Sequence, residues 1–226
     1  MRVLDLEHAR GSLARGLARQ AMELAARDSA ETAGILNEVH QMAPNIRSRQ
    51  RFAARIRGRR GVVQALPTSQ GLVVVLRTVL GVDLRKDGVD CFREERIAWT
   101  RFHVRTGKGL IVFKVHSVHA TRHVMQRRVE RSDCPLSGLL GDMDAAMVRA
   151  LSRLAKGDVL TDRDDAYLPA RRGVWAGGTE VTQVDPGWGP AFRKAAPMEI
   201  FAIRTFLGEA EMRPTVWLGW SGEKVA

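Results

Sequence analysis

Hydrophobic residues in the first quarter of the chain recur at intervals of three and four positions. This period places apolar side chains on one face of a helix, and it predicts helices over residues 12–27, 29–44 and 45–61. The apolar face of the first of these helices consists of Leu13, Leu17, Ala21 and Leu24. Pro44 is expected to end the second helix, because a proline inside a helix removes a backbone hydrogen bond.

From Gly71 onward, the apolar residues are adjacent or alternate with polar ones, which is the spacing of strands. Strands are predicted over residues 71–80, in a hairpin over residues 97–116 that turns at residues 106–109, and over residues 172–178, 199–206 and 214–220. Two helices are predicted between these strands, over residues 118–131 and 143–156. Asp142 or Asp144 is expected to cap the start of the second, and Gly157 to follow its end.

Helices therefore come first, followed by strands, two more helices and further strands. This order predicts an α+β fold, in which N-terminal helices precede a mainly antiparallel sheet packed against two helices. We expect residues 1–66 to form a helical, arginine-rich N-terminal region and residues 67–226 to form an α+β domain that carries the catalytic site.

The charge of the chain is strongly positive and concentrated in two segments. Among 226 residues there are 36 Lys and Arg against 25 Asp and Glu, a net charge of +11. Residues 96–131 contain nine basic residues and one acid, whereas residues 45–60 contain seven arginines and no acid. Such patches favour phosphate-rich partners. We therefore predict that the segment of residues 45–60 binds nucleic acid, and RNA in particular. Its arginines are Arg47, Arg49, Arg51, Arg55, Arg57, Arg59 and Arg60. The alternative is an ordinary solvated helix face.

Several classes of protein are disfavoured by what the sequence lacks. Cys91 and Cys134 do not form a C-x-x-C pair, which fits the reducing cytoplasm. No apolar run approaches the roughly 18 residues of a membrane helix, and the first ten residues carry two acids instead of an apolar signal region. Residues 162–165 include three aspartates but lack the glycine and distal glutamate of a calcium loop. We therefore expect no membrane association, no metal and no cofactor.

Histidine and arginine are densest in residues 115–133. If residues 118–131 are helical, His119, His123 and Arg127 share one face and Arg122 lies beside them. Imidazole can exchange a proton near neutral pH and guanidinium can neutralise a phosphoryl group, so this set suits metal-free phosphodiester cleavage. A solvated surface, or a zinc site that includes His116, would explain the same residues.

The segment SVHATRHVMQR, residues 117–127, resembles the S-x-H-A-x-x-R-x-x-x-R pattern of small bacterial domains that are grouped with the barnase, EndoU, colicin-nuclease and RelE-like ribonuclease toxins. Ser117, His119, Ala120 and Arg127 match this pattern, whereas position 123 is His instead of Arg. Residues 173–177 are similar to a glycine-flanked strand of that fold. The resemblance implies metal-independent RNA cleavage, a phosphate-binding Thr205 on a later strand, and an acidic protein that neutralises the toxin.

Together these features predict a metal-independent endoribonuclease of the toxin type. His119 would exchange the proton of the ribose 2′-hydroxyl, with His123 beside it. Arg127 and Arg122 would stabilise the phosphorane, and Thr205 would position the phosphate. The alternative hypothesis is a non-catalytic, basic nucleic-acid-binding protein of the plasmid or phage maintenance type. A third is a basic structural protein whose histidines lie on the surface.

Overall fold

The computed structural model of the chain describes residues 3–32, 34–39, 42–43, 45–86, 89–107, 110–132, 137–189 and 192–223. Within these residues the strands form one sheet with the order β1-β2-β3-β4-β8-β7-β6-β5. The strands are β1 (Val62–Pro67), β2 (Gly71–Lys86), β3 (Val89–Gly107), β4 (Leu110–Thr121), β5 (Leu160–Asp162), β6 (Asp165–Ala170), β7 (Gly173–Thr182) and β8 (Met198–Gly208). The α-helices are α1 (Val3–Ser29), α2 (Ile35–Val39), α3 (Ile46–Ile56), α4 (Arg122–Arg131), α5 (Leu139–Leu154) and α6 (Pro214–Glu223).

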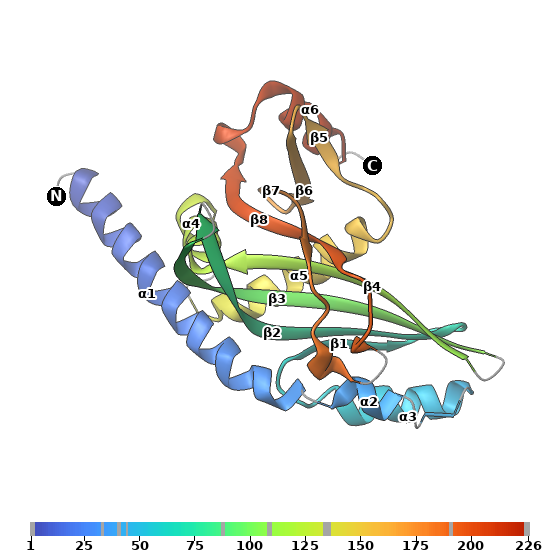
Figure 1. The fold of residues 1–226 in the computed structure, drawn as a ribbon. Coiled ribbons are helices and arrows are strands. Elements are labelled where there is room, and N and C mark those ends of the chain that lie inside the picture. Colours follow the sequence, from blue (N-terminus) through green and yellow to red (C-terminus); the bar gives the residue numbers. More distant parts are fainter. Residues whose placement is uncertain are drawn as a thin grey trace.

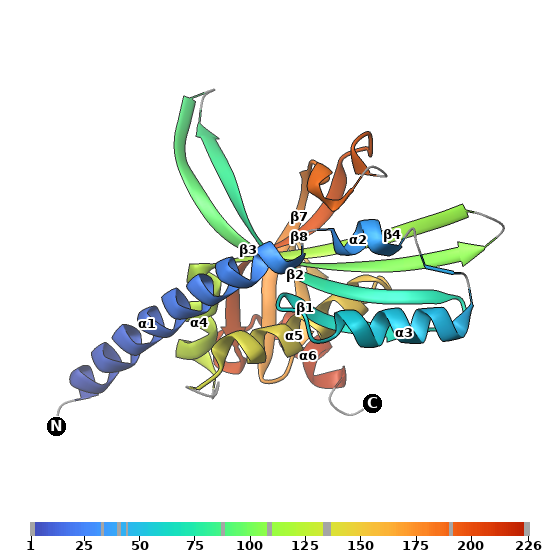
Figure 2. The same cartoon turned by 90° about the horizontal axis from the view of Figure 1, so that it is seen from below.

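The sheet is mostly antiparallel, and the predicted α+β fold class is confirmed (Figure 1). Only the β4–β8 pair among the described strands is parallel, and it joins Val118 to Phe201, His119 to Ala202 and Ala120 to Ile203. β2 and β3 continue beyond the body of the molecule as a two-stranded arm, which Figure 2 shows from below. Lys108 and Gly109, half of the predicted hairpin turn, lie outside the described residues.

Two hydrophobic cores cover the two faces of the sheet. The first joins α1, α4 and α5 to strand residues that include Trp99, Val118 and Trp175. The second joins α2 and α3 to strand residues that include Val74 and Phe102. Each core therefore combines side chains from residues 1–66 with side chains from residues 67–226, and β1 already begins at Val62.

Alternation along β4 decides which face each of its side chains meets. Val118 and Ala120 are buried in the first core, beneath the helices. Because neighbouring residues of a strand point to opposite faces, Ser117, His119 and Thr121 point to the other face. The same alternation on β3 places Arg96 beside Thr121, its partner in the ladder.

A buried ion-pair network connects α1, the sheet and α5. The guanidinium of Arg77 on β2 binds the carboxylates of both Asp28 and Asp144. The indole Nε1 of Trp99 donates a 2.7 Å hydrogen bond to Asp144. Burial raises the pKa of Asp144, while the neighbouring Arg77 opposes that shift. Loss of the guanidinium would therefore leave two largely buried carboxylates without their cation.

The structure overturns the predicted helix over residues 118–131. β4 runs to Thr121, and α4 begins only at Arg122 with the Thr121 side chain as its N-cap. The strand continues because Val118 and Ala120, two residues apart, both enter the first core. His119 consequently lies on a strand, and it does not share a helix face with His123 and Arg127.

The predicted strand over residues 214–220 is also wrong, because residues 214–223 form α6. Pro214 is its first residue, a position where the missing proline N–H costs nothing. Val216 and Trp220 are buried at helical spacing, while Leu218 between them is 64% exposed.

The predicted N-cap of the helix expected over residues 143–156 is also wrong. Helix α5 starts at Leu139 after Gly138, whose φ of 85° suits glycine. Asp142 lies within the helix, where it accepts a hydrogen bond from Arg128. Asp144 instead binds Arg77 and Trp99 in the buried ion-pair network. Gly157 does follow the helix end, with a φ of 77°.

Candidate active site

A cavity of about 350 Å³ opens where β3, β4, β8 and β7 lie side by side. It lies on the sheet face to which His119 and Thr121 point, at the N-terminal end of α4. Its lining residues are Glu94, Arg96, His119, Thr121, His123, Glu180, Ala202, Ile203 and Arg204. A volume of this size lies at the lower end of small-ligand sites.

His119 forms the inner wall of the cavity and is only 3% exposed. Its Nε2 lies 3.1 Å from Ser117 Oγ, which in turn lies 2.8 Å from Thr100 Oγ1. Its buried Nδ1 has no hydrogen-bond partner among the described residues. Burial, followed by the neighbouring Arg96, lowers the pKa of His119 to about 4 against an opposing effect of Glu180. The imidazole is therefore neutral at neutral pH.

A chain of alternating charges crosses the cavity. Arg96 Nε lies 2.7 Å from Glu94 Oε2, and Arg96 Nη1 lies 2.8 Å from Glu180 Oε2. Arg96 belongs to β3 and Glu180 to β7, although β4 and β8 lie between these strands in the sheet. The sheet must therefore curl around the cavity. The Arg96 side chain is 12% exposed, but that of Glu180 is 42% exposed and accessible from the cavity.

The rim carries further groups that can bind an anion. His123 is exposed in the first turn of α4, where free backbone N–H groups favour an anion. Arg204 occupies an irregularity in the β7–β8 ladder, between the paired positions 203 and 205. Its side chain is 66% exposed, and its nearest carboxylate among the described ion pairs is that of Asp165, at 3.9 Å. The guanidinium can therefore turn toward a ligand.

The structure brings together only part of the predicted set. His119 and His123 line the same cavity. Arg122 lines a different one, with Arg19 and Arg93 among others. Arg127 pairs with Glu130 at 2.8 Å. Thr205 accepts a 3.3 Å hydrogen bond from Arg131. Arg122, Arg127 and Thr205 are therefore not among the residues that line the His119 cavity.

Four charged lining residues were missed from the sequence: Glu94, Arg96, Glu180 and Arg204. One signal was available for Arg96. Gly107 pairs with Leu110, so a tight hairpin turn sets position 96 opposite Thr121. Nothing local connects Glu180 to this place, because its contact with Arg96 spans 84 residues of sequence.

The arginine cluster of residues 47–60 is largely engaged within the protein. Glu38 pairs with Arg55 and Arg59 at 2.9 and 2.7 Å, and Glu31 lies 3.7 Å from Arg60. Backbone oxygens accept the other contacts, from Arg49 to Ser69 and from Arg57 to Ala65. Residues 45–60 themselves contain no acid, but Glu31 and Glu38 from earlier in the chain pair with part of this cluster. Among the described ion pairs and hydrogen bonds, none involves the exposed Arg47 or Arg51, and nucleic-acid binding by the cluster stays a prediction.

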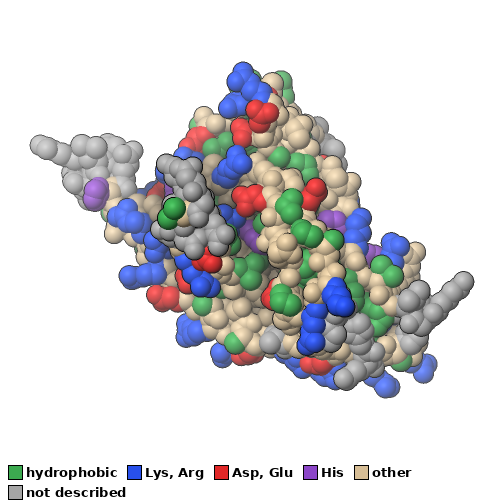
Figure 3. Space-filling model, viewed as in Figure 1, with side chains coloured by type: hydrophobic (Ala, Val, Ile, Leu, Met, Phe, Trp, Pro, Cys, Tyr) green, Lys and Arg blue, Asp and Glu red, His purple; other side chains and the backbone are tan. Residues whose placement is uncertain are grey.

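Within the described residues, no three His, Cys, Asp or Glu side chains are grouped so that they could hold a metal ion. Asp162 and Asp165, two of the three aspartates in residues 162–165, both face Arg213, at 3.2 and 3.9 Å. No helix in the described part of the chain is long and apolar enough to span a bilayer. Figure 3 shows that acidic and basic side chains are intermixed over much of one molecular face.

Comparison with known proteins found no matching family model, no matching curated protein and no matching solved structure. The resemblance to the ribonuclease toxins therefore rests on residues 117–127 and the later strands alone.

Proposed function

We propose that the protein is a metal-independent endoribonuclease whose chemistry takes place in the His119 cavity. One observation carries this proposal: two carboxylates, two imidazoles and two guanidiniums line one cavity of about 350 Å³. Metal-free cleavage of RNA needs a base, an acid and cations that neutralise the phosphoryl oxygens. Glu180, His123, Arg96 and Arg204 can supply these functions.

In the proposed reaction Glu180 accepts the proton of the ribose 2′-hydroxyl as the 2′-oxygen attacks phosphorus. The bond from phosphorus to the 5′-oxygen breaks, and protonated His123 donates its proton to that leaving oxygen. The products are a 2′,3′-cyclic phosphate and a 5′-hydroxyl. Arg96, Arg204 and the free N–H groups of α4 stabilise the additional negative charge on the phosphoryl oxygens. DNA, which lacks the 2′-hydroxyl, is not a substrate.

This assignment gives His119 a different role from the one predicted. A general base works best when its pKa lies near the working pH, and a pKa of about 4 is too low for that. A neutral His119 can instead accept a hydrogen bond from the Ser117 hydroxyl, while its buried Nδ1 does not face a substrate. We therefore assign His119 to the shape of the inner cavity wall.

The test is cleavage of labelled RNA in EDTA, beside DNA of the same base sequence. We expect Glu180→Gln and His123→Ala each to lower the turnover of RNA by about 10²–10⁴-fold. His8→Ala, a change of an exposed histidine on α1, is the matched control and should cleave normally. Wild-type rates in Glu180→Gln, or cleavage of DNA, would refute the proposed mechanism.

A second candidate is a non-catalytic nucleic-acid-binding protein. The engagement of Arg96 with both Glu94 and Glu180 favours it, because a closed ion-pair chain can be purely structural. In that case wild-type protein retains RNA but leaves it intact. If the protein is a ribonuclease toxin, an acidic protein must also exist that neutralises it. The ribonuclease proposal includes a cytoplasmic location.

A further inference from the structure

A row of basic side chains follows β3 and β4 on the sheet face opposite to the His119 cavity. We call it the β3–β4 basic stripe, and it consists of Arg101, His103, Arg105, Lys114 and His116. On β3 these residues alternate with Phe102 and Val104, which are buried in the second core. The stripe residues therefore point to the other face, away from that core. Arg105 and Lys114 are exposed, and the other three are partly exposed.

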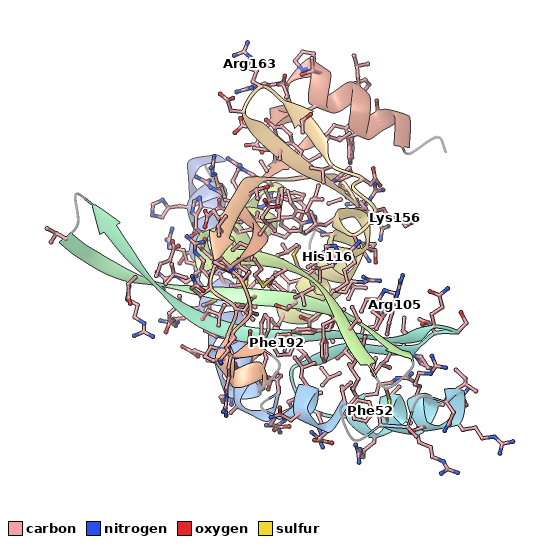
Figure 4. The ribbon with its side chains drawn as sticks, turned by 45° about the vertical axis from the view of Figure 1, so that its right-hand side comes forward. Phe52, Arg105, His116, Lys156, Arg163 and Phe192 are labelled. Atoms are coloured by element: carbon pink, nitrogen blue, oxygen red, sulfur yellow. The ribbon has the colours of Figure 1, made fainter. Side chains whose placement is uncertain are left out.

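The stripe is formed by the pairing of the two strands. Arg101 lies opposite His116, and His103 lies opposite Lys114. Successive basic residues on one strand are about 6.8 Å apart, since each residue advances about 3.4 Å. Figure 4 shows Arg105 and His116 on the same side of the molecule as Lys156, beyond the end of α5. The stripe is therefore a regular band, and further positive charge lies on the same side.

None of the described ion pairs involves Arg101, Arg105 or Lys114. The adjoining strands cannot supply an acid either, because residues 62–76 contain no charged residue. The cations of Arg101, Arg105 and Lys114 lie on two neighbouring strands and repel one another. A partner that brings negative charge would reduce this repulsion.

The two histidines report the same excess of positive charge. Burial, followed by Arg101, Arg105 and Lys114, lowers the pKa of His103. Burial, followed by Lys114, Arg101 and His103, lowers the pKa of His116. The stripe thus repels additional protons when no partner is bound.

We propose that the β3–β4 basic stripe binds RNA through its phosphodiester backbone, as a surface separate from the His119 cavity. The choice of RNA among polyanions rests on the proposed function. The stripe contains no Phe, Tyr or Trp on which a base could stack, so we assign its main contacts to phosphates, which do not depend on base sequence. Val112, which is 57% exposed, lies opposite Arg105, and Leu66, which is 45% exposed, lies opposite Val73, the β2 partner of His103.

The test uses binding of a labelled, unstructured RNA oligonucleotide at several salt concentrations, in a Glu180→Gln background that prevents cleavage. The stripe variant is Arg101→Gln/Arg105→Gln/Lys114→Gln. Each lost phosphate contact lowers the slope of log affinity against log salt by about 0.7 for a single strand, so three should lower it by about 2. The affinity at about 0.1 M salt should fall by roughly 10- to 100-fold on the same basis.

The matched control is Arg15→Gln/Arg19→Gln/Arg27→Gln, which removes three exposed positive charges from α1. It should change the slope much less than the stripe variant does. If Arg101 proves necessary for folding, the single variant Arg105→Glu, at an exposed position, replaces the triple variant. It should likewise lower the slope and the affinity for RNA. Equal slopes for stripe and control variants would overturn the proposal. So would stripe-dependent binding of anionic lipid vesicles with unchanged RNA affinity.

A dinucleotide substrate separates this proposal from the proposed function. It is too short to reach the opposite face, so the stripe variant with Glu180 restored should cleave it at the wild-type rate. If the wild type cleaves no RNA but the stripe still determines RNA binding, the ribonuclease proposal fails and the stripe proposal stands. If cleavage occurs and the stripe has no effect on binding, the ribonuclease proposal stands and the stripe proposal fails.

Discussion

The neutral state of His119 makes the stability of the protein depend on pH in a defined way. The pKa of this buried histidine is about 4, against an ordinary value of 6.5. At pH 7 both the folded and the unfolded protein carry it uncharged. Between pH 6.5 and 4 the unfolded chain binds a proton that the folded protein excludes, so stability falls as the pH falls. At about 1.4 kcal/mol for each unit of pKa difference, the loss near pH 4 is about 3 kcal/mol.

The variant His119→Gln should remove this part of the pH dependence. A glutamine amide does not titrate, and it can keep a hydrogen bond to Ser117. We expect the free energy of unfolding of the variant, relative to wild type, to improve by about 3 kcal/mol between pH 7 and pH 4. Other titrating groups, including His103 and His116, are common to both proteins and cancel in the difference.

Urea unfolding followed by tryptophan fluorescence measures this difference at each pH. His8→Gln, on the exposed side of α1, is the control and should lose stability in parallel with wild type. If His119→Gln also loses stability in parallel with wild type, the imidazole titrates normally. The cavity wall would then be hydrated, and the argument that excludes His119 as a general base would no longer hold.

Three substitutions and one control substitution test the packing of the fold, all by urea unfolding. Arg77→Ala leaves Asp28 and Asp144 without their cation and should cost about 3–5 kcal/mol. Gly61→Ala should cost more than about 1 kcal/mol, because φ is +77° and the new Cβ would lie 2.5 Å from a methyl carbon of Thr32. Trp220→Ala should cost about 3–5 kcal/mol, whereas Leu218→Ala on the exposed side of α6 should change stability by less than about 0.5 kcal/mol. Equal costs at positions 218 and 220 would contradict the helical assignment.

The sequence was most informative where one local period extended over many residues. The spacing of Leu17 and Ala21 predicted α1, and the run of β-branched residues after Gly71 predicted β2. Short segments were harder, because a few apolar residues fit either period. Residues 214–220 were read as a strand for this reason, although Pro214 marks a helix start. Residues 118–121 were assigned to a helix because their polar residues also fit a helical face.

The candidate site depended much less on the local pattern. The sequence indicated that histidine and positive charge gather in residues 96–131, and both the cavity and the β3–β4 basic stripe draw residues from that segment. It could not separate them, since His116 and His119 point to opposite faces only when residues 110–121 form a strand. The strand state was decided by burial of Val118 and Ala120 under the helices.

The sequence by itself determined the α+β class, the basic charge and the segment that carries the histidines. Tertiary structure alone decided which charges are available. Glu38 pairs with Arg55 of α3 and with Arg59, whereas none of the described ion pairs involves Arg101, Arg105 or Lys114. Curling of the sheet brings Glu180 of β7 to Arg96 of β3 and so completes the cavity. The physical reason is that helical and strand periods are set by neighbours in sequence, but ion pairs and burial depend on strand register and sheet curvature.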